Sequence, residues 1–165
     1  MTASAKPGRC VLAIDPYLHG FGWALLEGPD LLVDWGIYQT RTRRPERILG
    51  RIAALLQRYE PHLLVVEDIH HPRCRRRERA RLLISEIRDM ARTADIPVHV
   101  VPLKDIRDHY RNLGARSKDA VAGLIALRFP ELQRIRPPRR KNWMREDERM
   151  AVFDATAMAL ATIER

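Results

Sequence analysis

The sequence is poor in cysteine and in long apolar runs. Its two cysteines, Cys10 and Cys74, are too few and too unpatterned for a disulfide framework or a zinc site. No apolar run approaches the ~20 residues that cross a bilayer, and the N-terminus lacks the apolar core of a signal peptide. We therefore expect a cytoplasmic protein with a disordered lead-in at residues 1–8 and a single domain at residues 9–165.

Acidic residues are also scarce relative to basic ones. The chain has 21 Asp and Glu against 30 Lys and Arg, which gives a formal net charge of +9. Arginine supplies most of the excess, and its planar guanidinium can bind phosphate with two parallel hydrogen bonds. A high-GC coding bias would explain the choice of arginine over lysine, but not the net charge. The composition therefore predicts a polyanionic partner, most often nucleic acid.

The pattern of apolar and turn residues predicts an α/β protein that begins with an antiparallel meander. Val11 to Ile14 is an apolar run typical of a buried strand, and Pro16 is expected to stop its pairing. Two glycines then permit a reversal into a second strand over 21–26, and a third strand is predicted over 31–40.

Strands and helices alternate through the rest of the chain. Helical spacing of apolar residues and proline or serine start signals support these helices. The predicted elements are helices over 45–59, 78–93, 117–129 and 145–164, a helical turn over 103–110, and buried strands over 62–67 and 96–101. A meander followed by strand–helix alternation predicts one sheet with both antiparallel and parallel pairing.

Three acids lie on three separate predicted elements. Asp15 and Glu67 each end a predicted central strand, and functional groups of α/β sheets gather at the carboxyl ends of strands. Asp154 lies among apolar and alanine neighbours in the last helix, where an unpaired carboxylate is costly to bury. Three such carboxylates would form an oxygen cage suited to Mg²⁺ or Mn²⁺. The alternative for Asp15 is a turn residue that hydrogen-bonds its own backbone.

The order of these motifs resembles a known nuclease family. Ile-Asp15-Pro is followed by Gly-Phe-Gly-Trp-Ala, then by Leu-Leu-Val-Val-Glu67, and near the end by Phe-Asp154-Ala-Thr-Ala-Met-Ala-Leu. Together they resemble the RuvC branch of the RNase H-like nucleases over about residues 9–163. That resemblance implies an RNase H-like α/β fold with a mixed sheet and helices on both faces, and a homodimer. It also implies a role in DNA recombination and repair, through metal-dependent, symmetric nicking of four-way DNA (Holliday) junctions.

The resemblance also assigns roles to individual residues. It implies that Asp15, Glu67 and Asp154 are catalytic and hold Mg²⁺, with Mn²⁺ as a substitute and two ions in each active site. In a two-metal site one ion activates water and the other stabilises the leaving oxygen. The resemblance further implies that Lys118 is a catalytic basic residue, which could bind the scissile phosphate.

One position departs from the family pattern. RuvC relatives carry a further acid three residues before the last aspartate, and here that position is Ala151. On a continuous helix Asp147 would lie ~20° from the direction of Asp154 but roughly 10 Å away along the axis. Asp147 is therefore the predicted fourth metal ligand. An acid in a solvated first turn, favoured by the helix dipole, is an equally good interpretation.

Two basic segments flank the acid-bearing elements and are predicted to contact nucleic acid. A generic basic loop is the alternative for the two histidines, and a solvated charged face for the arginines. Trp143 could stack on nucleic acid or anchor its loop to the core. The predicted nucleic-acid contacts are His70, His71, Arg73, Arg75, Arg76, Arg77 and Arg79 after the Glu67 strand, and Arg139, Arg140 and Lys141 before the last helix.

Two other functions compete with junction cleavage. A nuclease of the RuvC/YqgF type could process RNA, although the long arginine segments fit the resolvase branch better. The second is a catalytically silent nucleic-acid-binding module, which Ala151 favours. The three retained acids argue against a silent module, because like charges held close together destabilise a protein that has no use for them.

Overall fold

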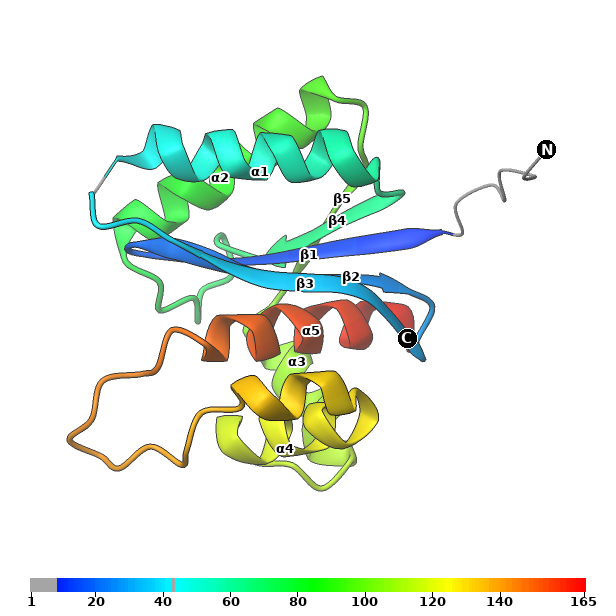
Figure 1. Ribbon diagram of the computed structural model, residues 1–165, viewed down its shortest axis with the longest axis vertical. Coiled ribbons are helices and arrows are strands. Elements are labelled where there is room, and N and C mark those ends of the chain that lie inside the picture. Colours follow the sequence, from blue (N-terminus) through cyan, green and yellow to red (C-terminus); the bar gives the residue numbers. More distant parts are fainter. Residues whose placement is uncertain (1–8, 43) are drawn as a thin grey trace.

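The computed structural model describes residues 9–42 and 44–165, and its centre is a five-stranded sheet (Figure 1). The predicted lead-in at residues 1–8 lies outside the described residues. The strands run in the order β3-β2-β1-β4-β5, with bounds β1 (Cys10–Tyr17), β2 (Gly20–Glu27), β3 (Leu31–Gln39), β4 (Leu63–Glu67) and β5 (Val98–Val101). The first three strands are antiparallel, whereas β4 and β5 pair in parallel. The predicted mixed sheet is confirmed.

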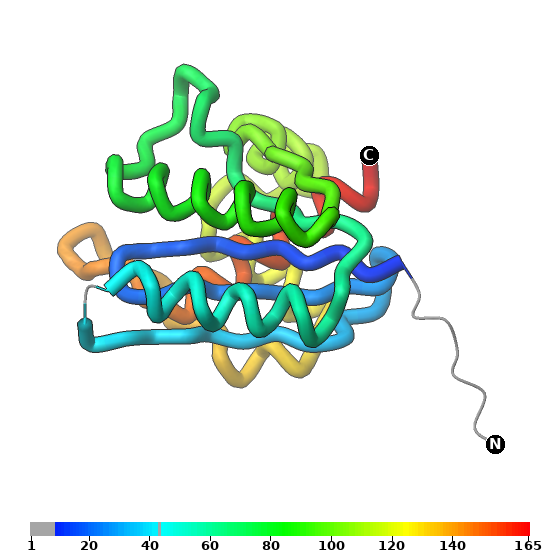
Figure 2. The backbone as a smooth tube through the Cα atoms, turned by 90° about the horizontal axis from the view of Figure 1, so that it is seen from above, coloured from blue at the N-terminus to red at the C-terminus, as the bar shows by residue number. Residues whose placement is uncertain are grey.

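Helices cover both faces of this sheet (Figure 1). One face carries α1 (Pro45–Tyr59) and α2 (Glu78–Thr93), which run side by side over the strands in Figure 2. The other face carries α5 (Met150–Ile163), with α3 (Leu103–Asn112) and α4 (Lys118–Arg128) on its outer side. Among the described residues no helix is both long and apolar enough to cross a membrane.

Alternating residues of β1 contribute to two separate hydrophobic clusters. Leu12 and Ile14 pack with α1 and α2, while Val11 and Ala13 pack with α5. This alternation follows from the two-residue period of a strand. A strand buried on both faces explains the continuous apolar run in the sequence. It also places the side chain of Asp15 on the α5 face, two residues after Ala13.

Several element boundaries differ from their predictions. β1 continues through Pro16 to Tyr17, because its parallel pairing with β4 ends at Ala13 and a proline is tolerated where one edge of a strand has no partner. The predicted turn at 103–110 is a complete helix, α3. The basic segment contains an unpredicted 3₁₀ helix, η1 (Pro130–Ile135), held to the core by the fully buried Leu132. The last helix begins at Met150, five residues later than predicted.

Gly22 allows α5 to approach the sheet closely. A Cβ atom at Gly22 would lie 2.3 Å from the carbonyl carbon of Ala151 and 2.5 Å from the amide nitrogen of Val152. In the β1–β2 ladder Gly22 is the partner of Asp15. A residue without a side chain at this point therefore lets the first turn of α5 rest against the strands beside the first acid.

Candidate active site

The three predicted acids line one cavity of about 630 Å³. Asp15 comes from β1, Glu67 from β4 and Asp154 from α5. Both strand residues point to the α5 face, because Glu67 follows Val65 by two residues as Asp15 follows Ala13. The carboxyl ends of two adjacent parallel strands and the start of the helix packed on them thus bring the acids together.

Burial affects the chemistry of these carboxylates. Asp15 and Glu67 are each only 6% exposed, and the Asp154 side chain is 28% exposed. Burial raises the pKa of Asp154 to about 7, with the negative charge of Asp15 acting in the same direction. The ammonium of Lys118 opposes this shift without cancelling it. Asp154 therefore holds a proton more tightly than an ordinary aspartate.

Lys118, the first residue of α4, lines the cavity. The Ser117 hydroxyl accepts a hydrogen bond of 3.1 Å from the amide of Ala120, which caps the helix as predicted. The Nζ of Lys118 lies 2.9 Å from Asp154 Oδ2 and 2.6 Å from Glu146 Oε1. Burial alone would lower the pKa of Lys118, but the two carboxylates outweigh it and raise that pKa.

Arg76 lies between the other two acids. Its Nε donates to Glu67 Oε2 at 2.5 Å, one terminal nitrogen forms an ion pair with Asp15, and the other donates to the carbonyl oxygen of Pro16 at 2.8 Å. Burial disfavours the guanidinium charge, yet the two carboxylates more than compensate and raise the pKa of Arg76. Arg76, predicted to contact nucleic acid, is here paired with two acids of its own chain. Its side chain folds inward and is 20% exposed.

These ion pairs determine how the residues fit a metal. Within residues 9–42 and 44–165 no three His, Cys, Asp or Glu side chains are grouped so as to hold a metal ion. Arg76 holds Asp15 and Glu67, and Lys118 holds Asp154. The donor set itself is three carboxylates on one cavity, the hard oxygen ligands that Mg²⁺ and Mn²⁺ prefer. The three carboxylates therefore have the right chemistry for a divalent ion, but they would have to release Arg76 and Lys118 to bind it.

Comparison with known proteins identifies the fold. Neither a scan against protein-family models nor a search of curated proteins found a match. Among solved structures, RuvC from Thermus thermophilus matches with a TM-score of 0.64 and 19% identity, covering 92% of each chain. T. thermophilus RuvC in complex with a Holliday junction substrate matches with the same score and identity, covering 92% of this chain and 91% of that one. The chain has the RuvC fold. The RNase H-like architecture expected from the motifs is confirmed.

The acids before α5 do not lie where the sequence suggested. Asp147 is outside the set of described residues that line the cavity, and its carboxylate receives hydrogen bonds of 2.9 and 2.6 Å from the guanidinium of Arg149. These bonds lower the pKa of Asp147. Glu146 instead lines the cavity and contacts Lys118. The angular argument that favoured Asp147 does not apply, because α5 begins only at Met150. Ala151 is buried against β2.

The loop between β4 and α2, residues 68–77, has a mixed structural role. His70 donates its backbone amide to Asp68, and His71 accepts the amide of Arg73 at 3.2 Å, so the two histidines take part in turns. Arg75 is exposed and lines the cavity. Arg73 and Arg77 of this loop are exposed, as is Arg79 at the start of α2. Arginine side chains are therefore available beside the acids.

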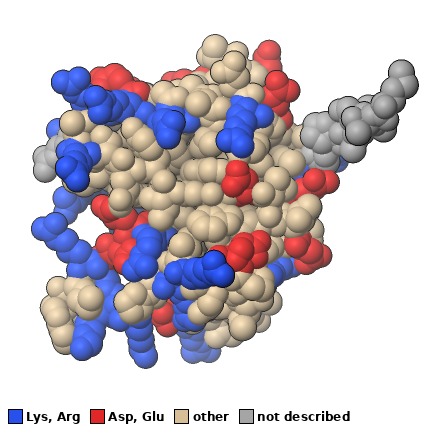
Figure 3. Space-filling view, viewed as in Figure 1, with Lys and Arg blue, Asp and Glu red and all other residues tan. Residues whose placement is uncertain are grey.

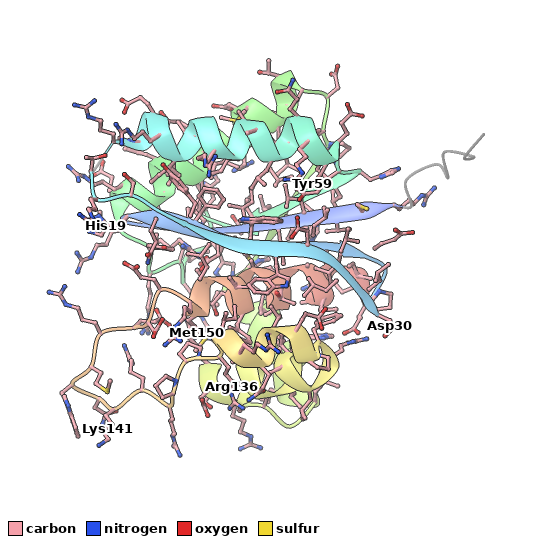
Figure 4. The ribbon with its side chains drawn as sticks, in the orientation of Figure 1. His19, Asp30, Tyr59, Arg136, Lys141 and Met150 are labelled. Atoms are coloured by element: carbon pink, nitrogen blue, oxygen red, sulfur yellow. The ribbon has the colours of Figure 1, made fainter. Side chains whose placement is uncertain are left out.

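The loop before α5, residues 136–149, presents the second basic surface. In Figure 3 Lys and Arg side chains gather around this loop, with acidic atoms between them, and Figure 4 shows Lys141 pointing away from the core. Arg139, Arg140 and Lys141 are exposed. Trp143 is 80% exposed, with the Lys141 ammonium 5.2 Å from its ring centre. Trp143 therefore does not anchor the loop to the core.

The sequence did not reveal every basic residue of the cavity. Arg107, Arg111 and Arg116 also line it, from α3 and the segment before α4. Their position after β5, a third strand whose carboxyl end meets the same sheet edge, was the available signal. The cavity is thus lined by both acids and cations.

Proposed function

We propose that this chain is a metal-dependent endonuclease that resolves four-way DNA junctions by symmetric phosphodiester hydrolysis. The observation that carries the proposal is the meeting of Asp15, Glu67 and Asp154, from β1, β4 and α5, at one cavity of a RuvC fold. The similarity to a RuvC structure bound to a Holliday junction substrate supports the choice of substrate.

Each acid has a role in this proposal. Asp15, Glu67 and Asp154 would hold Mg²⁺, or Mn²⁺ in its place, with two ions in the site. Bound metal would activate water and stabilise the leaving 3′ oxygen. Glu146 lies on the same cavity and would replace the acid missing at Ala151. The raised pKa of Asp154 means that its carboxyl must lose a proton before it can act as a ligand.

The basic residues would bind the DNA backbone. Lys118 sits between Asp154 and Glu146, so its ammonium is placed to hold the scissile phosphate once the acids turn to metal. Exposed arginines on the two loops would neutralise flanking phosphates, and Trp143 would stack on a base at the junction. We propose a single nuclease domain over residues 9–165 and a cytoplasmic homodimer, whose two sites would match the two-fold symmetry of the junction.

A catalytically silent DNA-binding module is the second candidate. The observation that favours it is the pairing of all three acids with cations of the same chain, together with alanine at position 151. A silent module would keep the basic loops and bind junctions without cutting them. Buried carboxylates that are fully paired cost less than unpaired ones, so stability alone does not distinguish the two candidates.

A cleavage assay separates the candidates. The wild-type protein would be incubated with a labelled four-way DNA junction, a linear duplex of the same sequence and a structured RNA, each with Mg²⁺ or Mn²⁺. Asp15→Asn removes one charge from the cavity without changing its shape. Asp89→Asn, on the exposed surface of α2, is the matched control.

We expect paired nicks at the junction from the wild type and from Asp89→Asn, and none from Asp15→Asn. Cleavage of the RNA alone would reassign the substrate to RNA. Tight junction binding by all three proteins with no cleavage in either metal would overturn the nuclease and establish the silent module.

A further inference from the structure

Arg76 uses its whole guanidinium on one site. All three of its nitrogens have partners: Glu67, Asp15 and the carbonyl oxygen of Pro16. Its partners are among the most buried polar side chains of the described residues, since the carboxylates of Asp15 and Glu67 are 9% and 7% exposed. A fork-shaped contact with two carboxylates and a carbonyl is far more specific than an ordinary surface ion pair.

This contact neutralises the two acids that come from the sheet. Two carboxylates held close together with little water repel each other and require a cation nearby. A divalent ion between Asp15 and Glu67 would meet that requirement, and Arg76 meets it from within the chain. A guanidinium and a metal ion cannot both use Asp15 Oδ1 and Glu67 Oε2, the two oxygens that Arg76 contacts. The two cations therefore compete for these carboxylates.

The loop that carries Arg76 holds other arginines beside the same cavity. Arg76 lies near the end of the loop that joins β4 to α2, where Arg73, Arg75 and Arg77 are exposed. The carbonyl of Ile69 is held by Arg81 at 2.6 Å, which fixes the start of the loop to α2. The same cavity is lined by Arg75 and Lys118, so an Arg76 side chain released from the acids would remain beside other cations.

We propose that Arg76 is a resident counter-cation that takes the place of the divalent ion between Asp15 and Glu67 and must leave before that ion binds. This inference rests on the proposed metal-dependent function and adds that Arg76 limits metal binding. The metal-free site is stabilised by Arg76, and metal affinity is reduced by the competition. DNA phosphate in the cavity offers the displaced guanidinium a new partner, so DNA and metal each favour the binding of the other.

Calorimetric titration with Mn²⁺, in the absence of DNA, tests the competition. Arg76→Gln removes the charge and keeps a shorter side chain that can still form hydrogen bonds. Arg76→Lys keeps a charge but lacks the planar fork of the guanidinium. Arg92→Ala, which removes an exposed arginine of α2 with a surface ion pair to Asp89, is the control. Circular dichroism and thermal unfolding would verify that each variant is folded.

We expect Arg76→Gln to bind Mn²⁺ about tenfold or more tightly than the wild type, because a charge-assisted network no longer has to be broken. Arg76→Lys should fall between them, and Arg92→Ala should match the wild type. Without metal Arg76→Gln should unfold at a lower temperature than the wild type, and Mn²⁺ should raise its midpoint more.

Equal or weaker Mn²⁺ binding by Arg76→Gln, with the wild type binding the ion, would overturn the competition and leave the metal-dependent nuclease intact. Absence of Mn²⁺ binding by every folded variant would overturn both. The two failures are therefore distinguishable in one experiment.

Discussion

The close approach of α5 to the sheet at Gly22 leads to a quantitative prediction for Gly22→Ala. The added Cβ would lie 2.3 Å from the Ala151 carbonyl carbon and 2.5 Å from the Val152 nitrogen, where ordinary contacts begin at 3.4 Å. Backbone atoms cannot rotate away as the end of a side chain can, so α5 must move by about 1 Å relative to β2. Overpacking of this kind costs about 1–3 kcal/mol of stability.

The displacement would also reach the site. Asp154 lies three residues after Ala151 on the same helix, and Gly22 is the ladder partner of Asp15. A movement of α5 therefore changes the separation of two proposed metal ligands. Misplacement of reacting groups by about 1 Å can reduce a rate by roughly 100-fold.

Gly50→Ala is the matched control. Gly50 is exposed in α1, and a Cβ there has no atom within 4 Å among the described residues. Replacing a glycine inside a helix by alanine should raise stability by about 1 kcal/mol. Urea unfolding would give both changes in stability, and junction cleavage would give the rates. A Gly22→Ala protein with wild-type stability and wild-type cleavage would refute the packing argument.

The acids of the cavity and the exposed Trp143 lead to three more tests. Glu146→Gln should weaken Mn²⁺ binding and junction cleavage more than Asp147→Asn, because Glu146 lines the cavity and Asp147 is paired with Arg149. Mn²⁺ titration and junction cleavage of both variants would check this, and a larger effect of Asp147→Asn would favour Asp147 as the fourth metal ligand. The pKa of Asp154 is raised to about 7, so the metal-free folded protein binds its proton more tightly than the unfolded chain. Its contribution to stability should therefore fall as pH rises from the ordinary aspartate value of 3.8 to about 7, while Mn²⁺ affinity rises. Urea midpoints of the wild type and Asp154→Asn between about pH 4 and about pH 8 would measure this fall, and identical profiles would contradict it. Trp143→Ala should weaken junction binding by about 1–3 kcal/mol without changing stability, as measured by fluorescence anisotropy and urea unfolding; an unaltered affinity would exclude stacking.

Local sequence signals account for the position of the strand acids. The apolar run before Asp15 and the run before Glu67 mark buried strands, and parallel pairing brings their carboxyl ends together. Alternation along the strand then sets the face on which each acid lies. The apolar runs and the alternation depend on neighbouring residues only, so they could be read without the structure. The pairing of β1 with β4 joins distant residues and was expected from the fold class.

The position of Arg76 could not be predicted in the same way. Nothing local separates it from Arg75 and Arg77, and its partner Asp15 is 61 residues away. The first residue of α5 could not be predicted either. Arg149 at its N-cap makes no side-chain capping bond, and residues 139–149 contain no proline that would mark a helix start. The helical angles used to choose Asp147 as the fourth ligand do not hold for this reason, since that segment is not helical.

Two adjacent acids at the end of β4, Glu67 as its last residue and Asp68 just after it, provide the most direct test of the proposed active site. Glu67 points into the cavity, whereas Asp68 accepts the amide of His70 in a turn. Glu67→Gln and Asp68→Asn should be compared for binding and cleavage of a labelled four-way junction with Mg²⁺. We expect that both variants bind the junction, that Asp68→Asn cleaves it like the wild type, and that Glu67→Gln does not cleave it. Cleavage by Glu67→Gln at the wild-type rate would contradict the assignment of this cavity as the active site.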